Sequence, residues 1–420
     1  VDNTVGGQYY PEVYEEFGDA YPNYAVGRTY ENGKYGIAKV TLSEMIGIEY
    51  EKSKGATDED IQKWNDFMDQ LTWEETCSIV SSGQRITVAV EGIVKPKTND
   101  VNASNAIIWK FDMGLNSNTA NRETGFSFYF DGANRNYFPT GYPCEGILAA
   151  SFDTDVAYAV GQAIGEDGLW SGASGLYGFG LGMHRSPYHG RAGEYYSEDP
   201  YLSGVMGGYE SKGAQSKGMY VYNKHFVLND QETNRTGHTT WLTEQAMRQI
   251  YLRPFEIAIE IGDAMNVMNA FNKIGSYWSG VDYNLMTACL RGEFGMSGFA
   301  VTDWYPTASM NITYGIMAGT DLPDGYANIT SYGPDNGNFG AYAHAVRRAA
   351  QRQLYTVANS SAMNFIGKDT RITVYEAEWI NVRIAITGGI AVAFAVMAGL
   401  MCAAYAWHVF AVISEKKRRG

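Results

Sequence analysis

The stretch Gly298-Phe299-Ala300-Val301-Thr302-Asp303-Trp304 predicts a short buried β-strand, because its first five residues are small, apolar or β-branched. The strand ends on a carboxylate and an indole. If several parallel strands converge, their carboxyl ends form a floor, and a rigid element then holds Asp303 there. Such a carboxylate can attack an anomeric carbon while Trp304 stacks on the C–H face of a sugar. The competing interpretation is that Asp303 caps the following helix.

The composition excludes several classes of protein. The chain has 420 residues, of which 45% are hydrophobic, so it can bury a large core. It has 32 basic and 46 acidic residues and a formal charge of −14, which argues against nucleic acid as a partner. The four cysteines show neither metal-ligand spacing nor a disulfide framework, and His189 and His238 add no metal motif. We therefore expect no metal and no cofactor.

Strand-like and helical segments alternate along the middle of the chain, and polar residues follow the strands. The predicted strands are Phe126–Phe130, Leu176–Met183, Met219–Asn223, Ala264–Ala270 and the strand that ends at Asp303. The predicted helices include Phe152–Leu169, Pro200–Ser216, Thr243–Glu260, Tyr283–Phe294 and Asn338–Asn359. This alternation predicts an α/β fold, a (β/α)8 TIM-like barrel with its site at the carboxyl ends of the strands. A doubly wound open sheet is the alternative, but the sequence contains no phosphate-binding loop to support it.

The periodicity divides the chain into five parts. Residues 1–56 are rich in Tyr, Gly and Glu and form an N-terminal extension. Residues 57–364 form the barrel, and residues 365–378 form a linker. Residues 379–413 form a single C-terminal transmembrane helix, and residues 414–420 form a basic tail.

The transmembrane prediction depends on Ile384–Ile413, thirty residues in which His408 is the only Asp, Glu, Lys, Arg or His. About twenty apolar residues are enough to cross a bilayer. The tail that follows carries four basic residues, and the positive-inside tendency places it in the cytoplasm and the barrel outside. We therefore expect a single-pass protein of the cell membrane. A buried hydrophobic helix is the alternative interpretation.

Three sequence blocks share residues and spacing with one enzyme family. The first block holds Met183-His184-Arg185-Ser186-Pro187, Gly190-Arg191 and Glu194-Tyr195-Tyr196-Ser197-Glu198-Asp199-Pro200. The second runs from Lys224-His225-Phe226 to Gln231-Glu232-Thr233-Asn234-Arg235, and the third from Leu290-Arg291-Gly292 to Thr302-Asp303-Trp304. Through these blocks, the stretch from about Asp60 to Asn364 resembles glycoside hydrolase family three, of the β-glucosidase type. A barrel that ends in a membrane helix resembles the permuted members, in which an α/β sandwich precedes the barrel.

The resemblance implies a retaining exo-β-glycosidase that removes terminal β-linked sugars from oligosaccharides. Asp303 would be the nucleophile and would form a covalent glycosyl-enzyme that water later hydrolyses. Charged groups suit the rest of the pocket because a neutral sugar offers many hydroxyls, and cations near Asp303 also keep it ionised. The residues expected to bind the sugar are Asp131, Arg191, Lys224, His225, Arg235 and Trp304.

The sequence departs from the family pattern in three places. An Arg expected six residues after Asp131 is absent, and Arg135 lies two places early. Phe271 stands where many members have Tyr. The acid/base Glu normally lies on a sandwich domain after the barrel, where this chain has its apolar segment instead. We therefore expect a partner, a missing domain or a second chain that carries the sandwich and its Glu, with residues 1–56 in the docking surface.

Two other hypotheses remain open. One is a catalytically impaired, membrane-anchored sugar-binding or structural surface protein, which the departures at Asp131 and Phe271 permit. The other is an N-acetylhexosaminidase, the branch that carries an acid/base His on a barrel loop with a Lys-His-Phe-Pro-Gly motif. Here Lys224-His225-Phe226 continues as Val227-Leu228-Asn229, which disfavours that branch.

Overall fold

The computed structural model describes residues 21–102, 104–107, 139–307, 310–331, 339–373 and 378–419. The chain forms two compact units, Val1–Ile372 and Thr373–Gly420. The predicted strand Phe126–Phe130 and the predicted sugar ligand Asp131 lie outside the described residues, as does Arg135.

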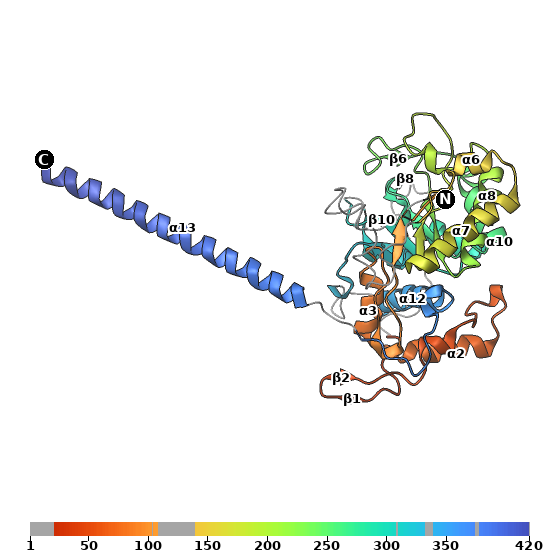
Figure 1. The fold of residues 1–420 in the computed structure, drawn as a ribbon, viewed down its shortest axis with the longest axis horizontal. Helices are drawn as coiled ribbons and strands as arrows, with labels where there is room; N and C mark the ends of the chain where they lie inside the picture. Colours follow the sequence, from red (N-terminus) through yellow and green to blue (C-terminus); the bar gives the residue numbers. More distant parts are fainter. Residues whose placement is uncertain are drawn as a thin grey trace. The chain divides into compact units, whose positions relative to one another are not determined.

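A six-stranded parallel sheet forms the centre of the first unit (Figure 1). The strands are β3 (Asp100–Asn102), β4 (Gly175–Tyr177), β5 (Tyr220–Phe226), β7 (Asn266–Asn269), β10 (Ala300–Trp304) and β11 (Leu322–Asp324). They lie side by side in the order of the chain, and every neighbouring pair is parallel. Sequential parallel strands with helical connections are the TIM-like arrangement, and all strands then end at one edge, the carboxyl edge.

The TIM-like prediction is confirmed, but among the described residues the central sheet has six strands, not the predicted eight. An irregular segment, residues 82–87, hydrogen-bonds to both ends of the sheet. The Gly83 N–H donates to the Gly325 carbonyl at 3.0 Å, directly after β11, and the Asp100 N–H donates to the Arg85 carbonyl at 2.9 Å. A Cβ at Gly83 would lie 2.3 Å from the Pro323 carbonyl oxygen, so only glycine permits this approach.

Helices cover the sheet, and α7, α8 and α10 lie side by side over it (Figure 1). The helices of the first unit are α2 (Asp58–Asp69), α3 (Trp73–Ser81), α6 (Glu145–Ala149), α7 (Thr154–Ser171), α8 (Pro200–Gln215), α9 (Glu244–Ala246), α10 (Arg253–Gly262), α11 (Ile312–Ala318) and α12 (Phe339–Ala358), with π-helical turns at Met247–Leu252 and Asn284–Glu293. Capping residues in the sequence mark the N-terminal ends of several helices. Asp199, for example, caps α8, and its Oδ1 accepts the Tyr201 N–H at 2.8 Å.

Two small sheets accompany the main one. A hairpin pairs β1 (Tyr30–Glu31) with β2 (Lys34–Tyr35), and a three-stranded sheet has the order β6-β8-β9. The members of the second sheet are β6 (Thr239–Thr240), β8 (Lys273–Ile274) and β9 (Tyr277–Trp278). Part of the predicted N-terminal extension packs into the first unit, because Ala38, Leu42 and Met45 are buried in one cluster with residues of α2 and α12.

One buried cluster fills the space that the sheet encloses. It takes side chains from five of the six strands and from the residue before β10, namely Tyr177, Tyr220, Tyr222, Met268, Phe299, Val301 and Leu322. Tyr177 of β4 also donates its hydroxyl to Oδ1 of Asp324 on β11 at 3.0 Å. Since β4 and β11 are separated by three strands in the sheet, this contact requires the sheet to curve around its interior.

A buried ion-pair triad fixes the start of β10. Asp321 has no exposed surface, and its two oxygens pair with Arg291 at 2.6 Å and with Arg352 at 2.9 Å. The same carboxylate accepts the Ala300 N–H at 2.8 Å, and Arg291 also donates to the Gly298 carbonyl at 2.6 Å. The triad thus ties β10 to α12 and to the π-helical turn before it.

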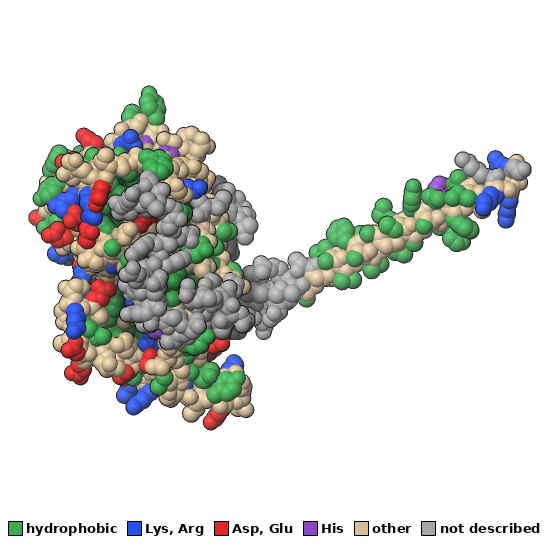
Figure 2. Space-filling view, turned by 180° about the vertical axis from the view of Figure 1, so that it is seen from behind, with side chains coloured by type: hydrophobic (Ala, Val, Ile, Leu, Met, Phe, Trp, Pro, Cys, Tyr) green, Lys and Arg blue, Asp and Glu red, His purple; other side chains and the backbone are tan. Residues whose placement is uncertain are grey.

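The second unit contains one helix, α13 (Glu378–Arg419). Its stretch Gly388–Arg419 is long and apolar enough to cross a membrane, and an 18-residue window within it has a mean hydropathy of 2.0. Figure 2 shows hydrophobic side chains along this helix and basic side chains near its end. The predicted helix is therefore present, and the membrane crossing stays a prediction.

The triad generates a stability prediction. The substitution Asp321→Asn leaves two guanidinium groups buried without a counter-charge, so we expect it to lower the free energy of unfolding by about 3–5 kcal/mol. The measurement is denaturant unfolding followed by circular dichroism. The matched control is Asp263→Asn, which removes a pair with Lys54 whose carboxylate is 67% exposed and should cost less than about 1 kcal/mol. Equal losses in the two variants would contradict the role of the triad.

Candidate active site

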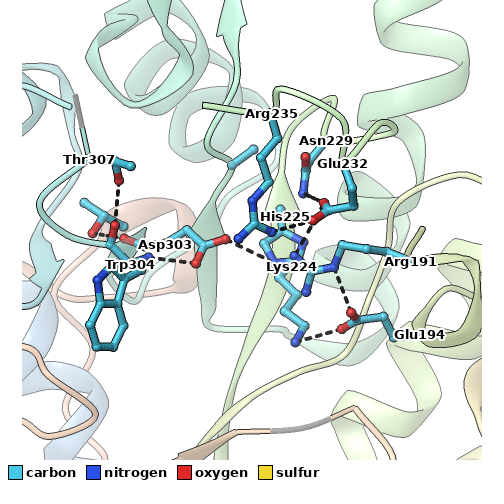
Figure 3. A network of polar contacts seen from close by, with 12 residues as sticks. Arg191, Glu194, Lys224, His225, Asn229, Glu232, Arg235, Asp303, Trp304 and Thr307 are labelled. Carbon is cyan, nitrogen blue, oxygen red and sulfur yellow. Dashed lines mark hydrogen bonds and ion pairs between the residues drawn. The ribbon is translucent and has the colours of Figure 1, made fainter. Parts of the chain in front are cut away.

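Charged side chains from distant parts of the sequence meet at the carboxyl edge of the sheet (Figure 3). Lys224 and His225 belong to β5, and Asp303 belongs to β10. Arg191 comes from the connection after β4, directly before the short turn Ala192–Glu194. In the sheet order β7 separates β5 from β10, and the side chains of His225 and Asp303 approach each other across it.

Asp303 presents its carboxylate at the end of β10 and is 16% exposed. The Trp304 N–H donates to its Oδ1 at 2.7 Å, and Nε2 of His225 lies 3.4 Å from its Oδ2. Among the described residues, Oδ2 makes no hydrogen bond, so its lone pairs are not engaged. Burial raises the pKa of Asp303, while the positive charges of Arg191 and Arg235 oppose that shift. These cations favour the anion that a nucleophile requires.

His225 is a neutral imidazole in this setting. Burial lowers the pKa of His225 well below its usual value, and the neighbouring charges of Arg191 and Lys224 lower it further. Its Nδ1 lies 3.3 Å from the Tyr195 hydroxyl. The neutral ring therefore borders Oδ2 of Asp303, at 3.4 Å from its Nε2, without adding a charge to the site.

Glu194 holds two of the cations in place. Its Oε1 accepts from Nε of Arg191 at 2.7 Å, and its Oε2 lies 3.1 Å from Nζ of Lys224. Burial opposes the ionisation of Glu194, but Lys224 and Arg191 overcome it and hold its pKa at about 2. Arg191 and Lys224 keep further N–H groups beyond these ion pairs, and such donors suit sugar hydroxyls.

Glu232 holds the third cation, Arg235, in place through an ion pair. Its Oε2 pairs with Nη1 of Arg235 at 2.7 Å, and its Oε1 accepts from Nδ2 of Asn229 at 3.1 Å. Oε1 also lies 3.9 Å from Nη1 of Arg191, so the two carboxylates join all three cations into one network. The guanidinium of Arg235 stacks on the ring of Phe271 at 4.2 Å from the ring centre. The Phe271 side chain, noted as a departure from the family pattern, therefore supports a predicted sugar ligand.

Trp304 forms a wall beside this network. Its side chain is 51% exposed, in contrast to the buried residues before it in β10. Its carbonyl accepts from the Thr307 hydroxyl at 2.6 Å, which fixes the chain directly after the strand (Figure 3). An exposed indole next to a carboxylate provides an apolar surface on which a sugar ring can stack.

The structure brings together six of the seven predicted site residues, and the seventh, Asp131, lies outside the described residues. Two carboxylates that organise the site, Glu194 and Glu232, were not predicted as site residues. Both lie inside the quoted sequence blocks, so the signal was present, but their pairing with cations depends on how the connections fold. Among the described residues, no group of three or more His, Cys, Asp or Glu side chains is arranged to hold a metal ion.

The sequence matches a known family across this site. The family profile described as "Glycosyl hydrolase family 3 N terminal domain" matches residues 131–321. A probable β-glucosidase I from Aspergillus flavus is 39% identical over 181 residues, which are 43% of this chain and 21% of that protein. A probable β-glucosidase I from Aspergillus fumigatus is 38% identical over 205 residues, covering 49% of this chain and 23% of that protein. The chain thus spans about one fifth of the length of these relatives.

Solved structures show the same fold. β-Glucosidase 3B from Thermotoga neapolitana in complex with glucose has a TM-score of 0.59 and 28% identity, and covers 72% of this chain and 44% of that one. A GH3 β-glucosidase from Bifidobacterium adolescentis has a TM-score of 0.59 and 26% identity, and covers 73% of this chain and 42% of that one. The resemblance predicted from the sequence blocks is therefore confirmed: residues 131–321 match the N-terminal domain of glycosyl hydrolase family 3, and the relatives and solved structures named here are β-glucosidases or probable β-glucosidases.

Proposed function

We propose that the chain is the barrel part of a retaining exo-β-glycosidase and that Asp303 is its nucleophile. The observation that carries the proposal is the position of the Asp303 carboxylate. It lies at the end of a barrel strand, next to a neutral His225 and the cations Arg191 and Arg235. The exposed face of Trp304 completes the site.

The geometry supports a covalent mechanism. Asp303 attacks the anomeric carbon, the glycosidic bond breaks, and its electron pair leaves with the departing oxygen. Water then releases the sugar from the ester. Because Arg191 and Lys224 are already held by Glu194, they do not need to reorganise to donate to sugar hydroxyls. Arg235 is held in the same way by Glu232 and Phe271.

A β-glucoside is the substrate class that the comparisons support. The relatives named above are probable β-glucosidases, and one of the solved structures contains glucose. We propose terminal β-linked sugars of oligosaccharides as the substrate.

The acid/base is proposed to come from outside the described barrel. A natural glycoside needs its leaving oxygen protonated, and the predicted source is a Glu on an α/β sandwich domain or on a second chain that carries it. The match covers only 21% of the Aspergillus flavus protein, so that relative is long enough to contain such a domain.

A single-pass membrane location is part of the proposal. The support is α13, whose apolar stretch is followed by basic residues, as the positive-inside tendency requires of a cytoplasmic end. The barrel would then face outward, where oligosaccharides are available. Fractionation of cells that express the full chain, followed by protease treatment of intact cells, tests this orientation.

The competing function is a sugar-binding surface protein without turnover, and the substitution Asp303→Asn separates it from an enzyme. We expect this variant to lose hydrolysis of a dinitrophenyl β-glucoside by a factor on the order of 10³ or more, because the nucleophile is gone. Binding of glucose, measured by calorimetry, should persist. The matched control is Asp199→Asn, since Asn also caps helix α8 and should leave turnover unchanged. A wild-type chain that binds glucose but never turns over would support the binding protein instead.

The missing acid/base generates a second prediction. A dinitrophenyl leaving group departs without protonation, whereas cellobiose needs an acid, which typically contributes a factor of about 10²–10⁴. We expect an activated 2-fluoro-glucoside to label Asp303, detected as a mass increase of the peptide that contains it, while cellobiose is hydrolysed poorly. If both substrates react at equal speed, the acid lies within this chain and the proposed partner domain is not required.

A further inference from the structure

A buried tyrosine hydroxyl lies at the ring nitrogen of His225 that does not face the nucleophile, and it has no part in the mechanism above. Nδ1 of His225 lies 3.3 Å from the hydroxyl of Tyr195, while Nε2 of the same ring lies 3.4 Å from Oδ2 of Asp303. Tyr195 is fully buried, so its hydroxyl does not reach a sugar. Any effect of this hydroxyl on the site therefore passes through the groups that it contacts.

The glycine-rich segment after β4 makes room for the Tyr195 ring. A Cβ at Gly182 would lie 2.3 Å from Cε2 of Tyr195, and a Cβ at Gly180 would lie 2.5 Å from Cδ1, so a larger residue at either position would collide with the ring. The imidazole of His189 stacks on the same ring, with 5.1 Å between the ring centres and an interplanar angle of 34°. These neighbours fix the position of the Tyr195 ring without using its hydroxyl.

The backbone fixes the distance between Tyr195 and His225 as well. Gly180 forms parallel β-bridges with Tyr195 and with Lys224, the residue before His225. The Leu181 N–H also donates to the Lys224 carbonyl at 2.6 Å. The hydroxyl and the imidazole are thus held next to each other by main-chain contacts, which remain when the hydroxyl alone is removed.

Two arrangements of protons are open to this pair. Burial and the neighbouring cations lower the pKa of His225, so the neutral ring carries a proton on one nitrogen. The Tyr195 hydroxyl lies 3.3 Å from the Asn229 carbonyl as well as 3.3 Å from Nδ1. If the hydroxyl donates only to that carbonyl, it accepts from Nδ1–H, and Nε2 presents a lone pair to Asp303. If it donates to Nδ1, the ring proton is on Nε2 and faces the carboxylate.

We propose that Tyr195 is a positioning residue whose hydroxyl donates to Nδ1 of His225 and thereby holds the ring with its Nε2–H facing Asp303. The inference rests on the proposed role of Asp303 as the nucleophile. A lone pair on Nε2 opposes an anion 3.4 Å away, whereas an N–H dipole favours it. The proposed arrangement therefore agrees with an ionised nucleophile, and it gives the buried Nδ1 a donor.

The first test measures how fast the activated 2-fluoro-glucoside labels Asp303 in the full chain, over a range of reagent concentrations. Tyr195→Phe keeps the ring that packs on the glycines and His189, so the variant should fold. We expect its maximal labelling rate to fall by about tenfold, the upper range for the loss of one neutral hydrogen bond, while the half-saturating concentration stays within about twofold. The matched control Tyr342→Phe removes another buried hydroxyl, which donates to the Ile329 carbonyl at 3.2 Å, and it should be labelled at the wild-type rate.

A double-mutant cycle tests whether Tyr195 acts through His225. In a His225→Gln background, followed by mass spectrometry over longer incubation, the added substitution Tyr195→Phe should change the labelling rate by less than about twofold, because the ring that the hydroxyl orients is gone. A loss as large as in the wild-type background would overturn the proposal, since the hydroxyl would then act by another route.

Nitrogen NMR observes the position of the proton directly. The chain has six histidines, so isotope labelling of histidine nitrogens gives few signals, and those of His225 are the ones missing from His225→Gln. In the wild-type protein we expect a protonated Nε2 and an unprotonated, hydrogen-bonded Nδ1. In Tyr195→Phe the Nδ1 signal should shift, because its donor is gone. A proton on Nδ1 in the wild-type protein would overturn the proposal, since Tyr195 would then be the acceptor.

The outcomes separate the proposed function from the role of Tyr195. Wild-type protein that is not labelled at Asp303 would overturn the proposed function. If the wild-type protein is labelled, a Tyr195→Phe variant with the wild-type labelling rate and an unchanged Nδ1 signal would overturn only the role of Tyr195.

Discussion

The buried carboxylate of Asp321, placed between Arg291 and Arg352, is the interaction on which the site depends most. It accepts the backbone N–H of Ala300 at the start of β10, and Asp303 lies three residues further along the same strand. Burial and the charge of Arg352 lower the pKa of Arg291 to about 10, which still leaves the guanidinium charged at neutral pH. Because two buried cations need this carboxylate, the strand cannot slip without separating charges in a medium of low dielectric.

At the carboxyl edge of the sheet, carboxylates again compensate neighbouring cations, but here the side chains are partly exposed to solvent. Three cations lie around Asp303. They form their ion pairs with two other carboxylates, Glu194 and Glu232. Each cation is thus paired with a carboxylate that is not the nucleophile. The cations favour the anionic form of Asp303, whose Oδ2 makes no hydrogen bond among the described residues, and they keep spare donors. A neutral sugar can enter this network without bringing or removing charge.

Much of the fold was predictable because it rests on local patterns. Apolar β-branched runs followed by polar residues indicated the strands, and helical spacing with caps such as Asp199 indicated the helices. The number of strands was not predictable in this way. The segment 82–87 joins the two ends of the sheet through a few backbone hydrogen bonds and has no strand pattern of its own. Phe271 was noted as a lost hydroxyl, whereas its ring supports Arg235.

The sequence by itself determined the alternating architecture, the family of the domain and the identity of the nucleophile candidate, because those signals lie in contiguous blocks around Lys224 and Asp303. Only the tertiary structure decided which charges compensate one another, since Glu194 and Glu232 meet their cations through connections whose course depends on packing. It alone brought Asp324 of β11 within hydrogen-bond reach of Tyr177 of β4, across the barrel. Such contacts join residues about 150 positions apart, and no local pattern encodes them, because they arise only when the strands curve around a common interior.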